Sequence, residues 1–250
     1  MTKPAIAVFT SYPDCFSKAK ALAEALSLSL VSDEQNDYDF LLILTPDYLG
    51  LKKTGSKSHP LHIDFLSGKL SFRRKQIGLR KEALARALGL KANTQPTIVD
   101  ATAGLAQDSF ILACLGFRVT LLERSPIIHA LVEDGIRRGA KDPAVERLRL
   151  IRADAVSWLK NCKNAERPDL IYLDPMFPER KKSALAKETM RLLHEIVGDD
   201  PDADRLLPAA LSCAKQRIVV KRPRLAPSLE GPAPSFSLTG SSSRFDVYLI

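Results

Sequence analysis

From about residue 97 onward, short apolar segments alternate with segments in which apolar residues recur at helical spacing. Strands separated by helices pair in parallel through crossover connections, so this alternation predicts a doubly wound, mostly parallel α/β sheet. Ligands of such sheets bind at the carboxyl ends of the strands, and we therefore expect functional residues directly after each strand. The predicted strands lie at 97–101, 118–123, 148–153, 170–173, 217–220 and 245–249, and the predicted helices at 107–116, 127–139, 156–160, 187–197 and 205–215.

The first part of the chain predicts a smaller α/β unit. Its pattern indicates strands at 5–9 and 40–44, a helix at 16–28, and a hairpin of strands 61–65 and 69–72. A basic segment follows and leads into a helix that ends near Gly89. We therefore predict a small N-terminal α/β domain at 1–72 and a catalytic domain at 73–250.

Composition narrows the classes of function. The net charge of +8 favours a polyanionic partner. The longest apolar runs have the length of strands and are too short to cross a bilayer, and no signal-peptide core is present at the N-terminus, so we expect a cytoplasmic protein with no membrane partner. The four cysteines are scattered, and His59 and His62 have no further ligands nearby in sequence, which predicts no disulfide framework and no metal site.

The loop after the first strand of the larger domain runs from Asp100 to Asp108 and is rich in small residues. Small residues let a ligand approach the backbone, and the following helix presents free N–H groups. Only Gly104 is present where a dinucleotide fingerprint needs three glycines, which disfavours a nicotinamide-dependent oxidoreductase. The loop suits a cofactor that carries an amino group and a carboxylate, although a tight strand–helix turn has the same pattern.

Acidic residues follow the next two strands. Glu123 ends the second strand, where a carboxylate can accept hydrogen bonds from both ribose hydroxyls of an adenosyl group. Asp154 follows the third strand, where its side chain could meet the adenine amino group. A solvated Glu123–Arg124 pair is the plain alternative for the second strand end.

The run Asp174-Pro175-Met176-Phe177 after the fourth strand resembles the Asp-Pro-Pro-Tyr/Phe motif of methyltransferases that act on exocyclic amines. An aromatic amine is a weak nucleophile, so a carboxylate and a backbone carbonyl that accept its hydrogens orient its lone pair toward the methyl group. An aromatic side chain can stack on the extruded base. A proline turn after a buried strand is the alternative.

Cations cluster near this motif and at the end of a later strand. Beside a base-binding pocket they would contact RNA phosphates, although a charge run is also typical of a solvated face. The candidate phosphate ligands are Arg180, Lys181, Lys182, Lys221 and Arg222.

With these motifs in place, the chain resembles the bacterial small-subunit ribosomal RNA guanine-N2 methyltransferases of the RsmJ type over most of residues 61–250. The matching runs are Val-Asp-Ala-Thr-Ala-Gly-Leu at 99–105, Leu-Glu-Arg-Ser-Pro at 122–126, Tyr-Leu-Asp-Pro-Met-Phe-Pro at 172–178, Lys-Lys-Ser-Ala-Leu at 181–185, Val-Val-Lys-Arg-Pro at 219–223 and Arg-Phe-Asp-Val-Tyr at 244–248.

The resemblance implies a Rossmann-like class I methyltransferase fold with a seven-stranded sheet and S-adenosylmethionine as the methyl donor. It implies N2-methylation of one guanosine near the 3′ end of 16S ribosomal RNA, as free RNA or in the 30S subunit. The cofactor contacts it implies are Gln107, Asp108, Glu123, Arg124, Asp154, Ala155 and Asp174.

Two departures from the family pattern concern loops. Family members tend to have Gly-Arg before the first-loop aspartate, where this chain has Ala106-Gln107, so a fixed cation is missing there. A glycine-rich stretch after the basic segment is replaced by Gln-Ile-Gly-Leu-Arg at 76–80. Gln107 is therefore the weakest of the predicted cofactor contacts.

Other functions remain open from the sequence. The same motif would serve an adenine-N6 methyltransferase acting on RNA or DNA, because it recognises an amine and not a particular ring. Glutamine-N5 methyltransferases usually carry Asn in place of Asp174. A non-catalytic RNA-binding protein with this fold would need neither Glu123 nor Asp174, and both are present.

Overall fold

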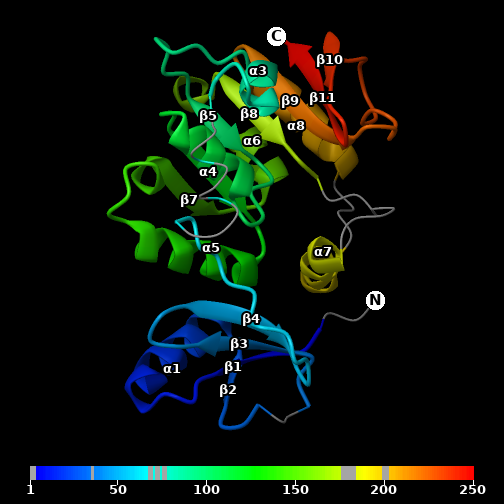
Figure 1. Ribbon diagram of the computed structural model, residues 1–250. Coiled ribbons are helices and arrows are strands. Elements are labelled where there is room, and N and C mark those ends of the chain that lie inside the picture. The colour runs from blue at the N-terminus through cyan, green and yellow to red at the C-terminus, as the bar shows by residue number, and fades with distance from the viewer. Residues whose placement is uncertain are drawn as a thin grey trace. The chain divides into compact units, whose positions relative to one another are not determined.

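The structure is a computed structural model that describes residues 4–34, 37–66, 70, 74, 78–175, 184–198 and 203–250 (Figure 1). It comprises two compact units, which are described separately below. The smaller unit contains Met1–Asp64, Ala130–Arg138 and Met176–Asp199, and the larger contains Phe65–His129, Gly139–Pro175 and Asp200–Ile250. The domain boundary that we predict between residues 72 and 73 remains a prediction.

A seven-stranded sheet forms the centre of the larger unit. Its strands are β5 (Ile98–Asp100), β6 (Val119–Glu123), β7 (Leu148–Arg152), β8 (Leu170–Leu173), β9 (Arg217–Pro223), β10 (Phe236–Thr239) and β11 (Ser243–Leu249). They lie in the order β10-β11-β9-β8-β5-β6-β7. The strands from β7 to β9 pair in parallel, whereas β11 is antiparallel to both β9 and β10. The predicted seven-stranded, mostly parallel sheet is confirmed, although β10 had no counterpart among the predicted strands.

Helices cover both faces of this sheet. They are α3 (Ala83–Leu88), α4 (Gln107–Cys114), α6 (Ala155–Asn161) and α8 (Ala203–Cys213), with 3-10 turns η2 (Val145–Arg147) and η3 (Asn164–Glu166). Helix α5 (Pro126–Gly139) follows β6 in the chain, and its residues Ala130–Arg138 belong to the smaller unit. Helix α4 connects β5 to β6, whereas α6 leads back from β7 to β8. Crossovers between parallel strands are right-handed as a rule, so connections that run in opposite directions along the sheet place α4 and α6 on opposite faces. Helix α8 packs on α6, as expected for another crossover in the returning direction (Figure 1).

The order of the strands places the site. The central strands are apolar because both of their faces are covered, and Ile171, Leu173 and Val219 are fully buried. Parallel pairing brings the carboxyl ends of β5, β6, β8 and β9 to one edge of the sheet. The predicted site residues Asp100, Glu123 and Asp174 therefore all lie at this edge.

The smaller unit is built on a four-stranded sheet with the order β2-β1-β3-β4. Its elements are β1 (Ile6–Phe9), η1 (Pro13–Cys15), α1 (Phe16–Leu26), β2 (Ser29–Val31), β3 (Phe40–Leu44), β4 (Leu49–Lys53) and α7 (Ala184–Val197). The predicted first strand, first helix and second strand are confirmed, and β2 and β4 were not predicted. Side chains of Ala7, Phe9, Leu41 and Ile43 form a buried cluster of this unit.

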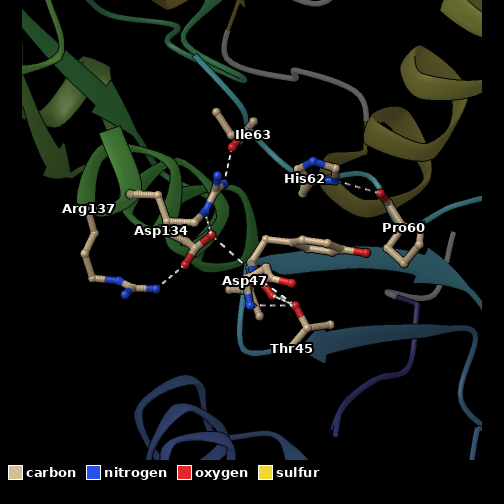
Figure 2. Close-up of polar contacts among 10 residues, drawn as sticks. Thr45, Asp47, Pro60, His62, Ile63, Asp134 and Arg137 are labelled. Atoms are coloured by element: carbon tan, nitrogen blue, oxygen red, sulfur yellow. Dashed lines mark hydrogen bonds and ion pairs between the residues drawn. The ribbon is translucent and has the colours of Figure 1, made fainter. Parts of the chain in front are cut away.

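The predicted strand at 61–65 is wrong. Only Leu61 pairs with a strand, in an isolated antiparallel bridge to Leu51, and the hairpin partner predicted at 69–72 lies outside the described residues apart from Leu70. The backbone carbonyl of Ile63 instead accepts a hydrogen bond from the guanidinium of Arg138 on α5 (Figure 2). A Cβ atom at Gly135 would lie 2.7 Å from Cγ2 of Ile63, so this segment packs closely on the helix.

Candidate active site

Asp100, the last residue of β5, is a buried carboxyl group. Its Oδ2 accepts a hydrogen bond from the Ser109 hydroxyl at 2.5 Å, and its Oδ1 accepts one from the Thr102 backbone N–H at 3.1 Å. Burial raises the pKa of Asp100 to about 7, although both hydrogen bonds act in the opposite direction. The negative charges of Asp108 and Asp174 raise the pKa further. Residues 101–106, between β5 and α4, form the loop that we predict to bind the cofactor and call the cofactor loop. Asp100 connects this loop to the first turn of α4 through its hydrogen bonds with Thr102 and Ser109.

The loop between β5 and α4 contains two residues with left-handed backbone conformation. Gly104 has φ of +49° and Ala106 has φ of +56°. Glycine adopts this conformation freely, whereas alanine there costs about 1 kcal/mol. Ala106 is fully buried and Gln107, the first residue of α4, is exposed. The strained residue Ala106 thus lies inside the loop, and the neutral side chain of Gln107 lies on its surface.

Glu123, the last residue of β6, ties two backbone segments together. Its Oε2 accepts a hydrogen bond from Gly104 N–H at 3.1 Å, and its Oε1 accepts one from Ser125 N–H at 2.7 Å. Burial raises the pKa of Glu123, and the two N–H groups partly oppose this effect. Arg124 is half-buried next to it. The carboxylate that we predict to bind ribose is therefore held in place by the cofactor loop itself.

Asp154 follows β7 and begins α6. Its Oδ1 accepts a hydrogen bond from Ser157 N–H at 2.8 Å, which makes it the N-cap of the helix. Burial alone would raise its pKa, but the bonds from Ser157 lower it, so the group is ionised at neutral pH. Ala155 is the first residue of α6. The structure thus gives Asp154 a capping role, and its contact with adenine remains a prediction.

Asp174 lies directly after β8, beside the cofactor loop. Its backbone N–H donates to Oγ1 of Thr102 at 2.5 Å, and its carboxylate Oδ2 lies 2.9 Å from Nζ of Lys221. The same ammonium lies 2.7 Å from Oδ2 of Asp108, which also accepts the hydroxyl hydrogen of Tyr172 at 2.8 Å. Asp108 and Asp174, which we predict to bind the cofactor, are therefore brought together by one cation.

The predicted RNA ligands are placed differently from one another. Lys221 is engaged with carboxylates, as described above. Arg222 is 4% exposed and donates through Nε and Nη2 to the backbone carbonyl of Pro227, at 2.8 and 2.5 Å. Burial lowers the pKa of Arg222. Phe177, Arg180, Lys181 and Lys182 lie outside the described residues, and Pro175 is buried. The contacts of all these residues with RNA remain predictions.

Three residues of the site were not singled out from the sequence. The hydroxyl oxygen of Thr102 accepts a hydrogen bond from the Asp174 N–H. The hydroxyl groups of Ser109 and Tyr172 donate to the carboxyl groups of Asp100 and Asp108, respectively. The Tyr172 side chain is almost fully buried, and burial with the nearby carboxylates raises its pKa well above the usual value. A hydroxyl inside the apolar run 170–173 is the signal that could have identified it, because a buried Tyr O–H needs a partner.

Comparison with known proteins identifies the family. Residues 21–250 match the family model described as "Putative SAM-dependent methyltransferase". The chain belongs to this family. It is 47% identical over 248 residues to the ribosomal RNA small subunit methyltransferase J of Coxiella burnetii, covering 98% of this chain and 97% of that protein. It is 45% identical over 254 residues to the protein of the same name from Thioalkalivibrio sulfidiphilus, covering 100% and 99%.

A solved structure extends the similarity to the fold. The SAM-dependent methyltransferase of Neisseria gonorrhoeae superposes with a TM-score of 0.76 at 35% sequence identity, covering 97% of this chain and 95% of that one. The match includes the smaller unit as well as the seven-stranded sheet. The class I methyltransferase fold and S-adenosylmethionine as cofactor are thereby established for this methyltransferase.

The acidic side chains of the site suit this cofactor chemically. S-adenosylmethionine carries a sulfonium and an ammonium group, and the carboxylates of Asp108 and Asp174 lie at the site, together with the buried carboxyl group of Asp100. Glu123 adds a carboxylate at the end of β6, where ribose hydroxyls bind in such sheets. The residues present therefore fit the methyl donor.

Within the part of the chain that the structure describes, no three His, Cys, Asp or Glu side chains are grouped as a metal ion would need. Among the same residues, no helix is long and apolar enough to cross a membrane.

Proposed function

We propose that this methyltransferase transfers a methyl group from S-adenosylmethionine to N2 of a guanosine near the 3′ end of 16S ribosomal RNA. The observation that carries the proposal is the placement of Asp174-Pro175 directly after β8, with the Asp174 N–H bound to Thr102 of the cofactor loop. The names of the relatives and the net charge of +8 support ribosomal RNA as the substrate.

The reaction needs orientation more than it needs a strong base. The cofactor supplies an electrophilic methyl group, and the guanine amine is a weak nucleophile because its lone pair is delocalised into the ring. The Asp174 carboxylate and the Pro175 carbonyl accept the two amine hydrogens and direct the lone pair, and Phe177 stacks on the extruded base. The nitrogen becomes strongly acidic as the new bond forms, so its proton leaves readily.

The other residues of the proposed site bind the two substrates. Glu123 accepts hydrogen bonds from ribose, and Asp154 with Ala155 lies beside adenine. Asp100, Gly104, Gln107, Asp108 and Arg124 complete the cofactor site. Arg180, Lys181 and Lys182 contact phosphates of the RNA. We place the reaction in the cytoplasm, on 16S RNA or on the 30S subunit, without a metal ion.

An experiment with labelled cofactor tests the function. The purified protein is incubated with radiolabelled S-adenosylmethionine and either 30S subunits or naked 16S RNA from a strain that lacks the gene, and nucleosides are then separated. Label in N2-methylguanosine supports the proposal, and the better substrate shows whether subunit structure is recognised. Label in N6-methyladenosine would replace the base assignment and keep the mechanism. A protein that fails to bind the cofactor would refute both the base assignment and the mechanism.

A substitution tests the role of Asp174. We expect Asp174→Ala to lose at least a hundredfold in kcat, because the amine loses its carboxylate acceptor. The measurement is single-turnover methyl transfer, with cofactor binding followed separately by calorimetry. Turnover at the wild-type rate in a variant that binds cofactor normally would contradict the mechanism.

A further inference from the structure

Lys221 donates hydrogen bonds to two carboxylates that come from different elements. The residue lies on β9, and its Nζ lies 2.7 Å from Oδ2 of Asp108 on α4 and 2.9 Å from Oδ2 of Asp174 after β8. Its side chain is 29% exposed, and those of Asp108 and Asp174 are 20% and 39% exposed. The ammonium therefore links the first turn of α4 to the motif that we propose to bind the target amine.

The charges around Lys221 keep it protonated. Burial by itself would lower the pKa of Lys221, but Asp108 and Asp174 outweigh this effect and raise it above the usual value. Asp100 on β5 and Tyr172 on β8 are also electrostatically coupled to these carboxylates. The residue opposite Lys221 on β11 is Phe245, which carries no charge. Lys221 thus supplies positive charge to Asp108 and Asp174.

We propose that Lys221 is a positioning residue for methyl transfer, which keeps Asp174 and Asp108 ionised and fixes the orientation of their carboxylates. This inference rests on the proposed function and replaces the phosphate contact that the sequence predicts for Lys221. A lysine that binds backbone phosphate presents its ammonium to the RNA. The ammonium of Lys221 is instead shared between two side chains of its own chain.

The consequence of removing the cation follows from the geometry. The Oδ2 atoms of Asp108 and Asp174 both lie within 3 Å of one Nζ atom, so the removal of Nζ takes away a positive charge that both carboxylates share. Neighbouring carboxylates raise each other's pKa, and the loss of a cation within about 4 Å raises the pKa of a carboxyl group by about 1–3 units more. A protonated Asp174 would be a poor acceptor for the hydrogens of the guanine amine.

The test compares three variants with the wild type. Lys221→Gln removes the charge and keeps a hydrogen-bond donor, Lys221→Arg keeps the charge, and Lys215→Gln removes an exposed lysine just before β9 as a matched control. One readout is the pH profile of single-turnover methyl transfer to 16S RNA. The other is the NMR titration of aspartate carboxyl carbons in the ligand-free proteins, with Asp108 and Asp174 assigned by Asn substitution.

For Lys221→Gln we expect the acid limb of the rate profile and the titration of at least one carboxyl to move up by about 1–2 pH units. Lys221→Arg keeps the positive charge, so its rate profile and carboxyl titrations should stay close to those of the wild type. Lys215→Gln should show neither shift. Unchanged titrations and an unchanged acid limb in folded Lys221→Gln would overturn the inference. A wild type that methylates no RNA would refute the proposed function, and the ligand-free titration would still decide the role of Lys221.

Discussion

Asp100 should make the stability of this methyltransferase fall as the pH rises toward neutrality. The carboxyl is 2% exposed, and burial raises its pKa from 3.8 to about 7 in the folded protein. In the unfolded chain it ionises near its ordinary pKa. Between these two values the folded state binds more protons than the unfolded state, so the free energy of unfolding decreases with pH and levels off above pH 7.

The substitution Asp100→Asn isolates this effect. An amide can accept the Thr102 N–H through its oxygen and donate to the Ser109 hydroxyl through its nitrogen, so both contacts of the carboxyl have a counterpart. Each pH unit between the two pKa values corresponds to about 1.4 kcal/mol. We therefore expect the stability of Asp100→Asn relative to the wild type to increase by about 2–3 kcal/mol between pH 5 and pH 8.

Urea unfolding at pH 5, 6, 7 and 8 measures this difference, and the other titrating groups cancel because both proteins contain them. Ser109→Ala serves as a second variant, since it removes the hydroxyl that lowers the pKa of Asp100. Its stability should continue to fall above pH 7. A difference between Asp100→Asn and wild type that is constant over the whole range would refute the reasoning.

Two further predictions concern other buried carboxylates. Glu123→Gln should weaken S-adenosylmethionine binding roughly 10- to 100-fold by calorimetry, because an amide cannot accept both backbone N–H groups and the ribose hydroxyls. The control Glu133→Gln, at an exposed position, should bind the cofactor as the wild type does. Equal affinities of Glu123→Gln and the wild type would exclude Glu123 from the cofactor site. Asp246→Asn should destabilise the fold by about 3 kcal/mol in urea, because fully buried Asp246 pairs with Arg244. The exposed Asp14→Asn should change stability little, and a similar effect of both would contradict the assignment.

The sequence predicted the sheet of the larger unit well because its strands are apolar runs with clear turns between them. It failed where partners distant in sequence decide the conformation. The run 61–65 has the composition of a strand, yet Ile63 packs on Gly135 of α5, and its carbonyl accepts a hydrogen bond from Arg138 of the same helix. Strand β4 was missed because it contains Gly50 and ends in two lysines, which weakens its β pattern.

The candidate site was predicted in the same unequal way. Asp100, Glu123 and Asp174 were predicted as site residues because each directly follows or ends a strand of a parallel sheet. The structure brings them to the same edge of the sheet, and their contacts with cofactor and RNA remain predictions. Lys221 occupies an equally recognisable position, but its partners come from α4 and β8. A local run of cations gave no indication of those partners, so the sequence favoured a phosphate contact. The role of a charged residue in this fold depends on which strand ends are neighbours.

The balance of charge in the network explains why a lysine is placed there. S-adenosylmethionine bears more positive charge than its demethylated product, so a group of carboxylates favours the cofactor over the product. Carboxylates alone would lose this preference, because neighbouring negative charges raise each other's pKa and favour the protonated, neutral form. Asp100 illustrates this, since burial and the charges of Asp108 and Asp174 raise its pKa to about 7. The ammonium of Lys221, which contacts both Asp108 and Asp174, keeps these two carboxylates ionised. The position of Lys221 on β9, in contact with both Asp108 and Asp174, thus lets these carboxylates lie close together and stay charged.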